Sequence, residues 1–482
     1  MLNNSKSKSI HKSQLNDLLS IFKNKKVLIA IIVTIGILVF FRIGSVIPMP
    51  FVKINQASDI NSSNSFLQMM NLLGGGGLTQ VSIFAIGISP YITAQIIVQL
   101  LSSDLIPPLA RLTKSGEKGR RKLEVITRIL TLPFAIVQGY AILSMISSTG
   151  SFVTISDRFP LATNTFGFYA FYILLMIAGT YITILLSDLI SKRGVGNGMT
   201  LIIITGILSS LFNSFGIVFS SLSQITGQNA ELISVISFII YLLFYIIVLI
   251  GVIFIEGSVR KIPIQQVGQS FSRESNDLSY LPIKINSASV IPVIFASSFM
   301  TIPTTIAQLL PSSNSAVFII NQYISLNSYT GLAIYFFLII LFTFFYSYVQ
   351  LNPNKVSQDF KKSGRFIPGV KVGEQTENYI SKILFRVNWI GGPFLALVAT
   401  LPYIVSIVVS QATNGLVTIP SYASLGGTGI VIMVSGTIEL WDSIRAASKT
   451  TSYSYQKKEL SESLTSMVAD ESSNINNDSQ LW

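Results

Sequence analysis

The stretch LLGGGGLTQVSIFAIGISPYITAQIIVQLL, from Leu72 to Leu101, places four consecutive glycines inside an apolar run of membrane-spanning length. Unpaired amide and carbonyl groups cannot face lipid, so a break at Gly74–Gly77 must be buried in protein or line a watery cavity. The preceding segment Asn64–Leu73 is too short to cross a bilayer, whereas Leu78–Leu101 is long enough. The pattern predicts a re-entrant helix over 64–73 followed by a complete membrane helix, and it indicates a pathway through the protein.

The composition is that of a polytopic membrane protein, because half of the 482 residues are hydrophobic and only 11% are charged. A membrane helix needs about 20 predominantly apolar residues, and ten stretches of the chain meet this requirement. They are Val27–Ile47, Leu78–Leu101, Leu123–Ile146, Phe166–Ser187, Asn197–Phe215, Leu232–Ile255, Ser289–Leu310, Gly331–Gln350, Val387–Ser410 and Leu425–Ile444.

The distribution of lysine and arginine predicts the orientation, because positively charged short loops stay in the cytoplasm. All but three of the 33 basic residues lie in the two tails or around the segments that follow the second, fourth, sixth and eighth stretches. The exceptions are Arg42, Lys53 and Arg158. Ten spans with both termini in the cytoplasm satisfy every loop, and one helix more or fewer would reverse all later loops.

Catalytic and metal-binding residues are scarce. The chain has no cysteine, and its one histidine, His11, lies in a polar tail, which argues against thiolate sites, zinc hydrolases and histidine catalysis. The glycines of 194–199 fail the G-x-G-x-x-G spacing, and no P-loop motif occurs. The carboxylates near helix ends, which are expected to be interfacial charges, are Asp188, Glu256, Glu439 and Asp442. We expect no enzyme activity, no cofactor and no metal, with transport driven by a partner or a gradient.

Two long polar interruptions, 256–286 and 351–386, lie on the predicted cytoplasmic side. Loops of this length in a compact domain are usually functional or disordered. The second carries basic residues around the turn-forming pairs Ser363-Gly364 and Pro368-Gly369. About half of this charge is what the positive-inside rule alone requires. The excess favours a protruding docking surface for acidic protein or for RNA phosphates.

Several stretches, in matching order, resemble the SecY family of channel subunits of the bacterial protein translocase. They are Gly77–Leu101, Lys114–Lys122 (KSGEKGRRK), Leu186–Ile204 (LSDLISKRGVGNGMTLIII), Pro282–Pro303 (PIKINSASVIPVIFASSFMTIP) and Asn352–Tyr379 (NPNKVSQDFKKSGRFIPGVKVGEQTENY). Any one of them alone is a weak pattern, whereas together they cover nearly the whole chain.

The resemblance implies an all-α membrane protein with ten transmembrane helices in two pseudo-symmetric, inverted halves of five, plus a re-entrant plug helix. Inverted repeats of this kind place the pathway between the halves. The parts implied are a cytoplasmic tail at 1–26, an N-terminal half at 27–215 with the plug at 64–73, a hinge loop at 216–230, a C-terminal half at 231–445 with cytoplasmic loops 256–286 and 351–386, and a cytoplasmic tail at 446–482.

Channels of this family have an hourglass pore closed at the waist by a ring of apolar side chains. The matching positions are Ile88 and Ile92 in the second helix, Met199 and Ile203 in the fifth, Ile294 in the seventh and Ile432 in the tenth. Alkyl groups offer water and ions no replacement for their hydration shell, so such a ring gates by dewetting and still fits any polypeptide. Met199 stands where isoleucine is common in the family, and its flexible side chain should soften the ring.

Below the ring, the resemblance places a plug and its hinge. Their residues are Phe66, Leu67, Met70 and Leu73, followed by Gly74, Gly75, Gly76 and Gly77.

A lateral gate, through which signal sequences reach lipid, is implied between helices 2 and 3 and helices 7 and 8. The candidate gate residues are Thr93, Gln138, Pro292, Ser298 and Thr301. Pro292 and Pro303 are expected inside the seventh helix, where they would remove backbone hydrogen bonds and favour bending.

The docking residues implied for ribosome and SecA are Arg260, Lys261, Lys361, Lys362, Arg365 and Lys371. Lys371 stands where arginine is common in the family, and lysine lacks the planar fork of arginine. The implied partners are SecE-like and SecG-like small subunits, the SecA ATPase, the ribosome with its RNA phosphates and exit-tunnel proteins, signal peptides and nascent chains, and membrane lipids. The implied location is the bacterial plasma membrane.

Two alternatives stay open. A secondary transporter for a small solute also has broken helices and inverted repeats, but it needs charged or coordinating groups at the bilayer midplane, where this chain has apolar residues. An accessory or organelle-type member with restricted clients is the second alternative, and the full-length loops 256–286 and 351–386 argue mildly against it.

Overall fold

The computed structural model describes residues 25–54, 77–102, 107–148, 153–155, 165–223, 230–266, 280–310, 315–326, 328–412 and 428–448. The predicted plug at 64–73, residues 224–229 of the predicted hinge loop and most of both predicted tails lie outside these residues. The chain divides into two compact units, the first made of Met1–Ile37, Asp188–Gly198 and Thr437–Trp482, and the second of Leu38–Ser187 and Met199–Gly436.

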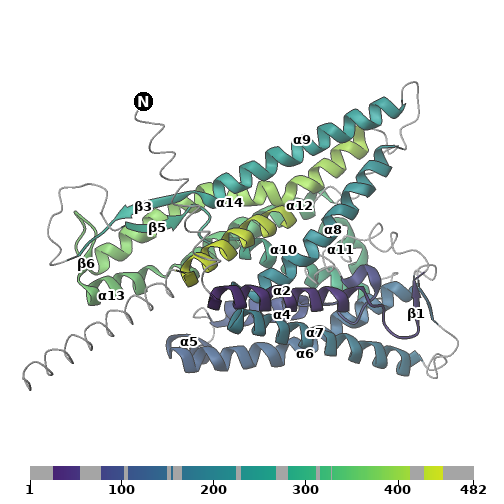
Figure 1. Cartoon of the computed structure of the whole chain (residues 1–482), viewed down its shortest axis with the longest axis horizontal. Helices are drawn as coiled ribbons and strands as arrows, with labels where there is room; N and C mark the ends of the chain where they lie inside the picture. The colour runs from purple at the N-terminus through teal and green to yellow at the C-terminus, as the bar shows by residue number, and fades with distance from the viewer. Residues whose placement is uncertain are drawn as a thin grey trace, which may run out of the picture. The chain divides into compact units, whose positions relative to one another are not determined.

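Helices make up most of the described residues (Figure 1). They are α2 (Lys25–Val46), α4 (Ser89–Leu100), α5 (Pro107–Lys114), α6 (Glu117–Ser148), α7 (Thr165–Arg193), α8 (Gly198–Leu222), α9 (Ala230–Gly257), α10 (Ile291–Leu309), α11 (Ser315–Tyr323), α12 (Tyr329–Gln350), α13 (Pro353–Ser363), α14 (Glu374–Ala412) and a further helix at 428–448. Three short antiparallel strand pairs join β1 (Val52–Ile54) to β2 (Val153–Ile155), β3 (Val259–Pro263) to β5 (Tyr280–Lys284), and β4 (Gln265–Gln266) to β6 (Arg365–Phe366).

Each of the ten predicted apolar stretches overlaps a helix of the described chain. Within that part, α2, α6, α7, α9, α12 and α14 are long and apolar enough to cross a membrane, and apolar portions of α8 and α10 are shorter. The chain is therefore a multi-pass membrane protein, and the count of ten spans stays a prediction.

The second apolar stretch is not one continuous helix, so the prediction of a complete helix over 78–101 was wrong. A 3-10 turn, η1, occupies Gly77–Gln80, and α4 begins only at Ser89. Gly87 has a φ of +56°, and Pro90 lies in the first turn of α4, where its missing N–H has no intrahelical partner to lose. These two residues start the helix eleven positions later than apolarity alone suggests.

The irregular backbone before α4 is buried in protein, as the glycine break requires. Met49 N–H donates to the Val81 carbonyl at 3.0 Å, and Ser82 N–H donates to the Gly77 carbonyl at 3.2 Å. Gly179 of α7 lies so close to the Ile83 carbonyl that an added Cβ would be 2.1 Å from its oxygen. These contacts bury the irregular backbone in protein, where broken helices of membrane proteins are tolerated.

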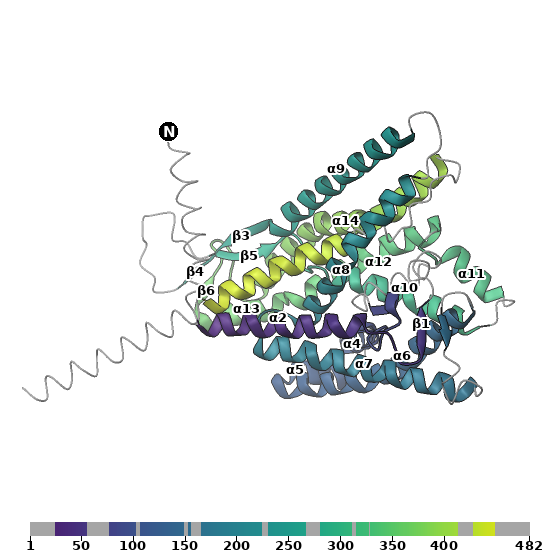
Figure 2. The ribbon, with the colours of Figure 1, turned by 45° about the vertical axis from the view of Figure 1, so that its right-hand side comes forward.

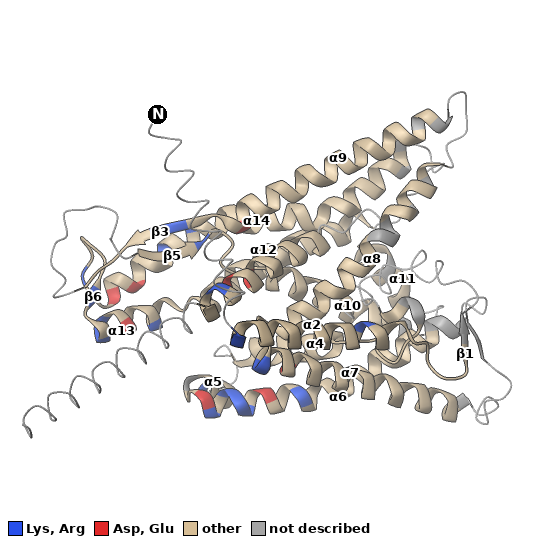
Figure 3. Ribbon diagram, in the orientation of Figure 1, with Lys and Arg blue, Asp and Glu red and all other residues tan. Residues whose placement is uncertain are grey.

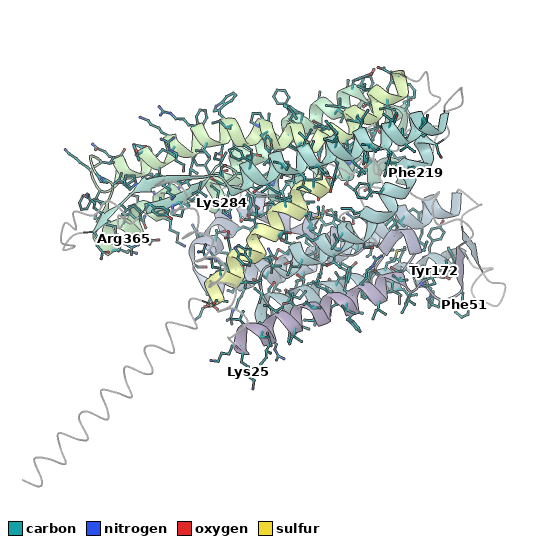
Figure 4. The ribbon with its side chains drawn as sticks, turned by 45° about the horizontal axis from the view of Figure 1, so that its top comes forward. Lys25, Phe51, Tyr172, Phe219, Lys284 and Arg365 are labelled. Atoms are coloured by element: carbon teal, nitrogen blue, oxygen red, sulfur yellow. The ribbon has the colours of Figure 1, made fainter. Side chains whose placement is uncertain are left out.

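A buried apolar cluster holds that segment against α6 and α7. Its members are Met49, Leu78, Val81, Ala85, Ile86, Ala141, Ile142, Leu143, Tyr172 and Met176. The Tyr172 hydroxyl donates to the Pro50 carbonyl at 3.0 Å, and Figure 4 shows Tyr172 and Phe51 at the same end of the second unit. The cluster places the start of α4 accurately relative to α6 and α7.

Helix α10 is the packing centre of the second unit, because it contacts α4 and α6 as well as α11, α12 and α14 (Figure 2). Helices α12 and α14 pack along each other, and the buried Ser347 hydroxyl of α12 donates to Asn388 Oδ1 of α14 at 2.8 Å. Helix α10 therefore lies between α4 and α6 on one side and α11, α12 and α14 on the other.

In the first unit, the loop after α7 is anchored to α2. The Thr34 hydroxyl accepts a hydrogen bond from Val195 N–H at 3.0 Å and donates to the Ala30 carbonyl at 2.9 Å. A Cβ at Gly194 would come within 2.3 Å of the Thr34 hydroxyl oxygen, so only glycine fits there without movement.

Two of the predicted loops are partly helical. Helix α14 begins at Glu374, so the last part of the predicted polar loop 351–386 is helical. Helix α8 continues to Leu222, so the first residues of the predicted hinge loop 216–230 are helical as well. The first turns of α14 are polar, so a search for apolar stretches does not register them, whereas residues 216–222 are mostly apolar and simply continue α8.

Candidate functional site

The predicted ring residues lie at or near the starts of the helices that carry them. Ile88 directly precedes α4 and Ile92 is in its first turn, while Met199 and Ile203 are in the first turns of α8. Ile294 is in the first turn of α10, and Ile432 is in the helix at 428–448. The five isoleucines are buried, with exposed fractions between 0% and 7%, and Met199 is half-buried.

The segments that carry these residues are neighbours in the second unit. Helix α4 packs against α10. The helix at 428–448 approaches α8 so closely that a Cβ at Gly436 would be 2.3 Å from Ile204 Cδ1. Ser435 of that helix lies 2.6 Å from Ser289, measured between the hydroxyl oxygens, just before α10. The structure therefore links α4 to α10, α10 to 428–448, and 428–448 to α8.

The plug residues from Phe66 to Gly76 lie outside the described residues. Gly77, the last residue of the predicted hinge, is buried at the start of η1. A Cβ there would be 2.8 Å from the Phe84 carbonyl oxygen, so glycine permits the close approach of the two backbone segments.

The candidate gate residues lie on the helices that meet at α10. Thr93 of α4 and Thr301 of α10 are buried and donate to carbonyls within their own helices, at 3.1 Å and 2.8 Å. Within the part of the chain that the structure describes, the Gln138 side-chain oxygen of α6 and the Ser298 hydroxyl of α10 are buried without a hydrogen-bond partner. The structure thus gathers buried polar atoms on three helices that pack against one another.

The expectation that Pro292 bends the seventh helix was wrong. Pro292 lies in the first turn of α10, where its missing N–H costs no intrahelical bond, and only Pro303 is inside the helix. Pro292 therefore favours the start of α10, and Pro303 is the residue of the two that removes an internal hydrogen bond.

The two polar loops form one structural body with its own core. Residues from the β3–β5 hairpin, α13, the turn after β6 and the start of α14 share a buried cluster, made of Ile262, Ile264, Ile283, Phe360, Ile367, Ile380, Ile383, Leu384 and Val387. Gln266 of β4 pairs with Arg365 of β6, which joins the two loops directly. We call this body the docking body.

Turn chemistry shapes the tip of the docking body. Gly364 ends α13 in the left-handed conformation, with φ +62°. At Ile367-Pro368-Gly369-Val370, the Val370 N–H donates to the Ile367 carbonyl at 3.0 Å and Gly369 has a φ of +79°, which is the pattern of a type II turn. The Thr376 hydroxyl donates to the Lys371 carbonyl at 2.9 Å. The loop is therefore an ordered surface.

The predicted docking residues are exposed on this body. Figure 3 shows lysine and arginine along β3 and α13, and Figure 4 marks Arg365 and Lys284 on the same part of the second unit. Lys261 Nζ lies 4.8 Å from the centre of the Tyr280 ring across the hairpin, which steadies one of the charges. The residues concerned are Arg260, Lys261, Lys361, Lys362, Arg365 and Lys371, all with exposed side chains.

Comparison with known proteins gives concordant results. The SecY family model matches residues 82–441. The protein translocase subunit SecY of Mycoplasma pneumoniae is 48% identical over 92% of this chain and 91% of its own length, and that of Staphylococcus aureus is 37% identical over 89% and 96%. The chain belongs to the SecY family.

Solved structures agree with this membership at the level of the fold. A structure described as that of a protein conducting channel matches with a TM-score of 0.61 and 18% identity, over 87% of this chain and 92% of the other. The Sec61 channel in a canine ribosome–channel complex from the endoplasmic reticulum matches with a TM-score of 0.58 and 17% identity, over 87% and 92%.

SecY family membership confirms the predicted fold class and the function of a protein-conducting channel. The alternative of a small-solute secondary transporter is wrong, because the family and its relatives are protein translocase subunits. This is a transport family and not an enzyme family.

Of the four carboxylates expected at the membrane interface, Glu256 is the most deeply buried in the protein. Its side chain is 4% exposed and accepts hydrogen bonds from Asn286 and from Ser435. Asp188 and Glu439 are half-buried and Asp442 is exposed. The available signal was a carboxylate at the end of a long apolar helix, followed thirty positions later by an asparagine.

Proposed function

We propose that this chain is the central pore of a bacterial plasma-membrane translocase, which moves unfolded preproteins across the membrane and releases membrane segments sideways into lipid. The observation that carries the proposal is the cluster of neighbouring helix starts bearing buried alkyl side chains at the predicted ring positions. Such a constriction excludes water and ions at rest and deforms around a passing polypeptide.

We propose that signal sequences leave the pore where α10 meets α4 and α6. The buried polar atoms of Gln138 and Ser298 support this exit site, because they have no hydrogen-bond partner among the described residues while the helices are packed. A helical signal segment that enters this site offers an apolar surface toward lipid and leaves the polar atoms to face the pore. The hydroxyls of Thr93 and Thr301 donate to carbonyls of their own helices, so these two hydrogen bonds persist when the helices move apart.

We propose that the driving partners, a ribosome or SecA, bind the docking body. Two similar solved structures are channels bound to ribosomes, and the exposed lysine and arginine residues of this chain suit phosphate or carboxylate. Small SecE-like and SecG-like subunits complete the assembly in this proposal. We also propose that residues 64–73 form a plug and that the chain is built of two inverted halves.

Reconstitution tests this function. Vesicles containing the chain with its small membrane subunits should protect a preprotein with an intact signal sequence from added protease, only when SecA and ATP are present. Vesicles that lack the chain are the control. Protection that occurs without SecA and without a ribosome would contradict a partner-driven channel.

A topology measurement follows from the charge distribution. A reporter inserted in 351–386 and one fused after Lys449 should both be cytoplasmic, while one in 147–165 should be outside. The readout is labelling of each reporter by a membrane-impermeant reagent in intact cells. An external reporter in 351–386 would overturn the ten-helix topology.

A further inference from the structure

A buried carboxylate joins three segments that are distant in the sequence. Glu256, in the last turn of α9, accepts a hydrogen bond from Asn286 Nδ2 through Oε1 and one from Ser435 Oγ, at 3.2 Å, through Oε2. Asn286 and Ser435 are 1% and 3% exposed. A charged side chain that is buried away from water is costly unless it is paired and hydrogen-bonded.

Ser289 completes this group. Its hydroxyl oxygen lies 2.6 Å from that of Ser435, and its carbonyl accepts a hydrogen bond from Asn286 Nδ2 at 3.0 Å. Ser289 has a φ of +54°, a conformation that L-residues rarely adopt and keep only where the surroundings hold them. We call Glu256, Asn286, Ser289 and Ser435 the polar clasp.

The polar clasp lies between the docking body and two helices that carry proposed ring residues. Ser289 lies two residues before α10, which carries Ile294, and Ser435 follows Ile432 by three residues on the helix at 428–448. Asn286 follows β5 of the docking body by two residues, and Ile285 N–H donates to the Ser258 carbonyl at 3.0 Å, next to β3. The clasp thus joins the base of the docking body to two helices that carry proposed ring residues.

We infer that the polar clasp positions α10 against the helix at 428–448 and thereby sets how strictly the channel rejects weak signal sequences. The inference rests on the proposed ring. A buried polar group that loses a hydrogen-bond partner is costly, even though Asn286 keeps the Ser289 carbonyl and Ser435 keeps the Ser289 hydroxyl when Glu256 is removed. Loss of the Glu256 carboxylate takes acceptors from Asn286 and Ser435 together, so α10 and the helix at 428–448 separate more easily.

Two substitutions of Glu256 test whether the polar clasp controls discrimination against defective signal sequences. Glu256→Ala removes the acceptors, whereas Glu256→Gln keeps an oxygen for Asn286 and offers an N–H to the Ser435 hydroxyl, which then accepts. We expect Glu256→Ala to raise export of a client with a defective signal sequence about tenfold, with export of an intact client unchanged. Glu256→Gln should keep the discrimination of the unaltered channel.

The matched control is Ser347→Ala, which removes an equally buried hydrogen bond, that to Asn388, between α12 and α14. It should leave discrimination unchanged. A purely structural role of Glu256 would reduce the amount of channel and lower export of both clients in proportion. That result, or unchanged discrimination in Glu256→Ala, would overturn the inference.

A geometric measurement separates the polar clasp from the ring. The chain has no cysteine, so Ser289→Cys with Ser435→Cys introduces the only two thiols, at positions whose hydroxyl oxygens are 2.6 Å apart. Added Glu256→Ala should slow disulfide formation at least about fivefold, and the completed disulfide should restore discrimination to that variant. An unchanged rate would reject the clasp whatever the ring variants do. A slowed rate together with an unresponsive Ile294→Asn channel would reject the ring.

Discussion

Replacing Ile294 by asparagine is expected to raise export of clients with defective signal sequences about tenfold, since a waist barrier lower by ~1.4 kcal/mol corresponds to that factor. Ile432→Asn should act in the same direction. Both isoleucines are buried at helix starts. An asparagine amide there can form hydrogen bonds with water, which an alkyl side chain cannot. The measurement is export of paired clients that differ only in the signal sequence.

Two controls belong to this prediction. Ile294→Leu keeps the volume and the apolar character, so it should preserve discrimination. Ile306→Asn places the same amide on α10 at a side chain that is 48% exposed, away from the proposed ring, and should not relax discrimination. If both ring variants export defective clients no better than the unaltered channel, the ring assignment is wrong.

The sequence predicted the membrane helices well and their ends poorly. Long apolar runs identify membrane helices because polar residues inside the bilayer are energetically costly. All ten predicted runs contain a helix. The ends depend on local chemistry instead. Gly87 and Pro90 determine where α4 begins, and Glu374 and Glu377 in its first turn suit the N-terminus of α14, although neither feature is part of an apolar run.

The candidate site residues were predicted only where the sequence resembles the SecY family. The ring and docking positions came from matched stretches, and the structure gathers their helices and exposes their charges as expected. The hydrogen bonds of Glu256 could not be predicted, because Asn286 and Ser435 become its neighbours only through tertiary packing. Pro292 was misread for a related reason, because its effect depends on a helix start that composition does not reveal.

Reversing two charges at the tip of the docking body, Arg365→Glu with Lys371→Glu, is expected to abolish export while the channel still inserts, pairs with its small subunits and stays tight to ions. Both side chains are exposed, and their structural roles use the backbone, since Arg365 pairs with Gln266 as a strand and the Lys371 carbonyl accepts from Thr376. The buried cluster beneath them is untouched. The variant should therefore fold normally, and export should be lost because ribosomes or SecA no longer bind.

The size of the effect follows from charge. Like charges placed across an interface cost several kcal/mol, which corresponds to more than about a hundredfold in affinity. Binding of ribosomes or SecA to vesicles containing the channel, measured against salt, should weaken by that order and lose part of its salt dependence. Lys371→Arg should strengthen binding, because it adds a planar fork for phosphate or carboxylate.

The matched control is Arg111→Glu with Lys118→Glu, which makes the same change in net charge at exposed residues of α5 and α6, outside the docking body. It should leave binding and export close to normal, because long-range charge is screened beyond about 10 Å at 0.1 M salt. Arg260, Lys261, Lys361 and Lys362 stay intact in both variants, so any remaining affinity reports the β3–β5 hairpin and α13. Normal binding of both ribosomes and SecA by the docking variant would mean that 351–386 is basic only because cytoplasmic loops retain positive charge, and that the partners bind elsewhere.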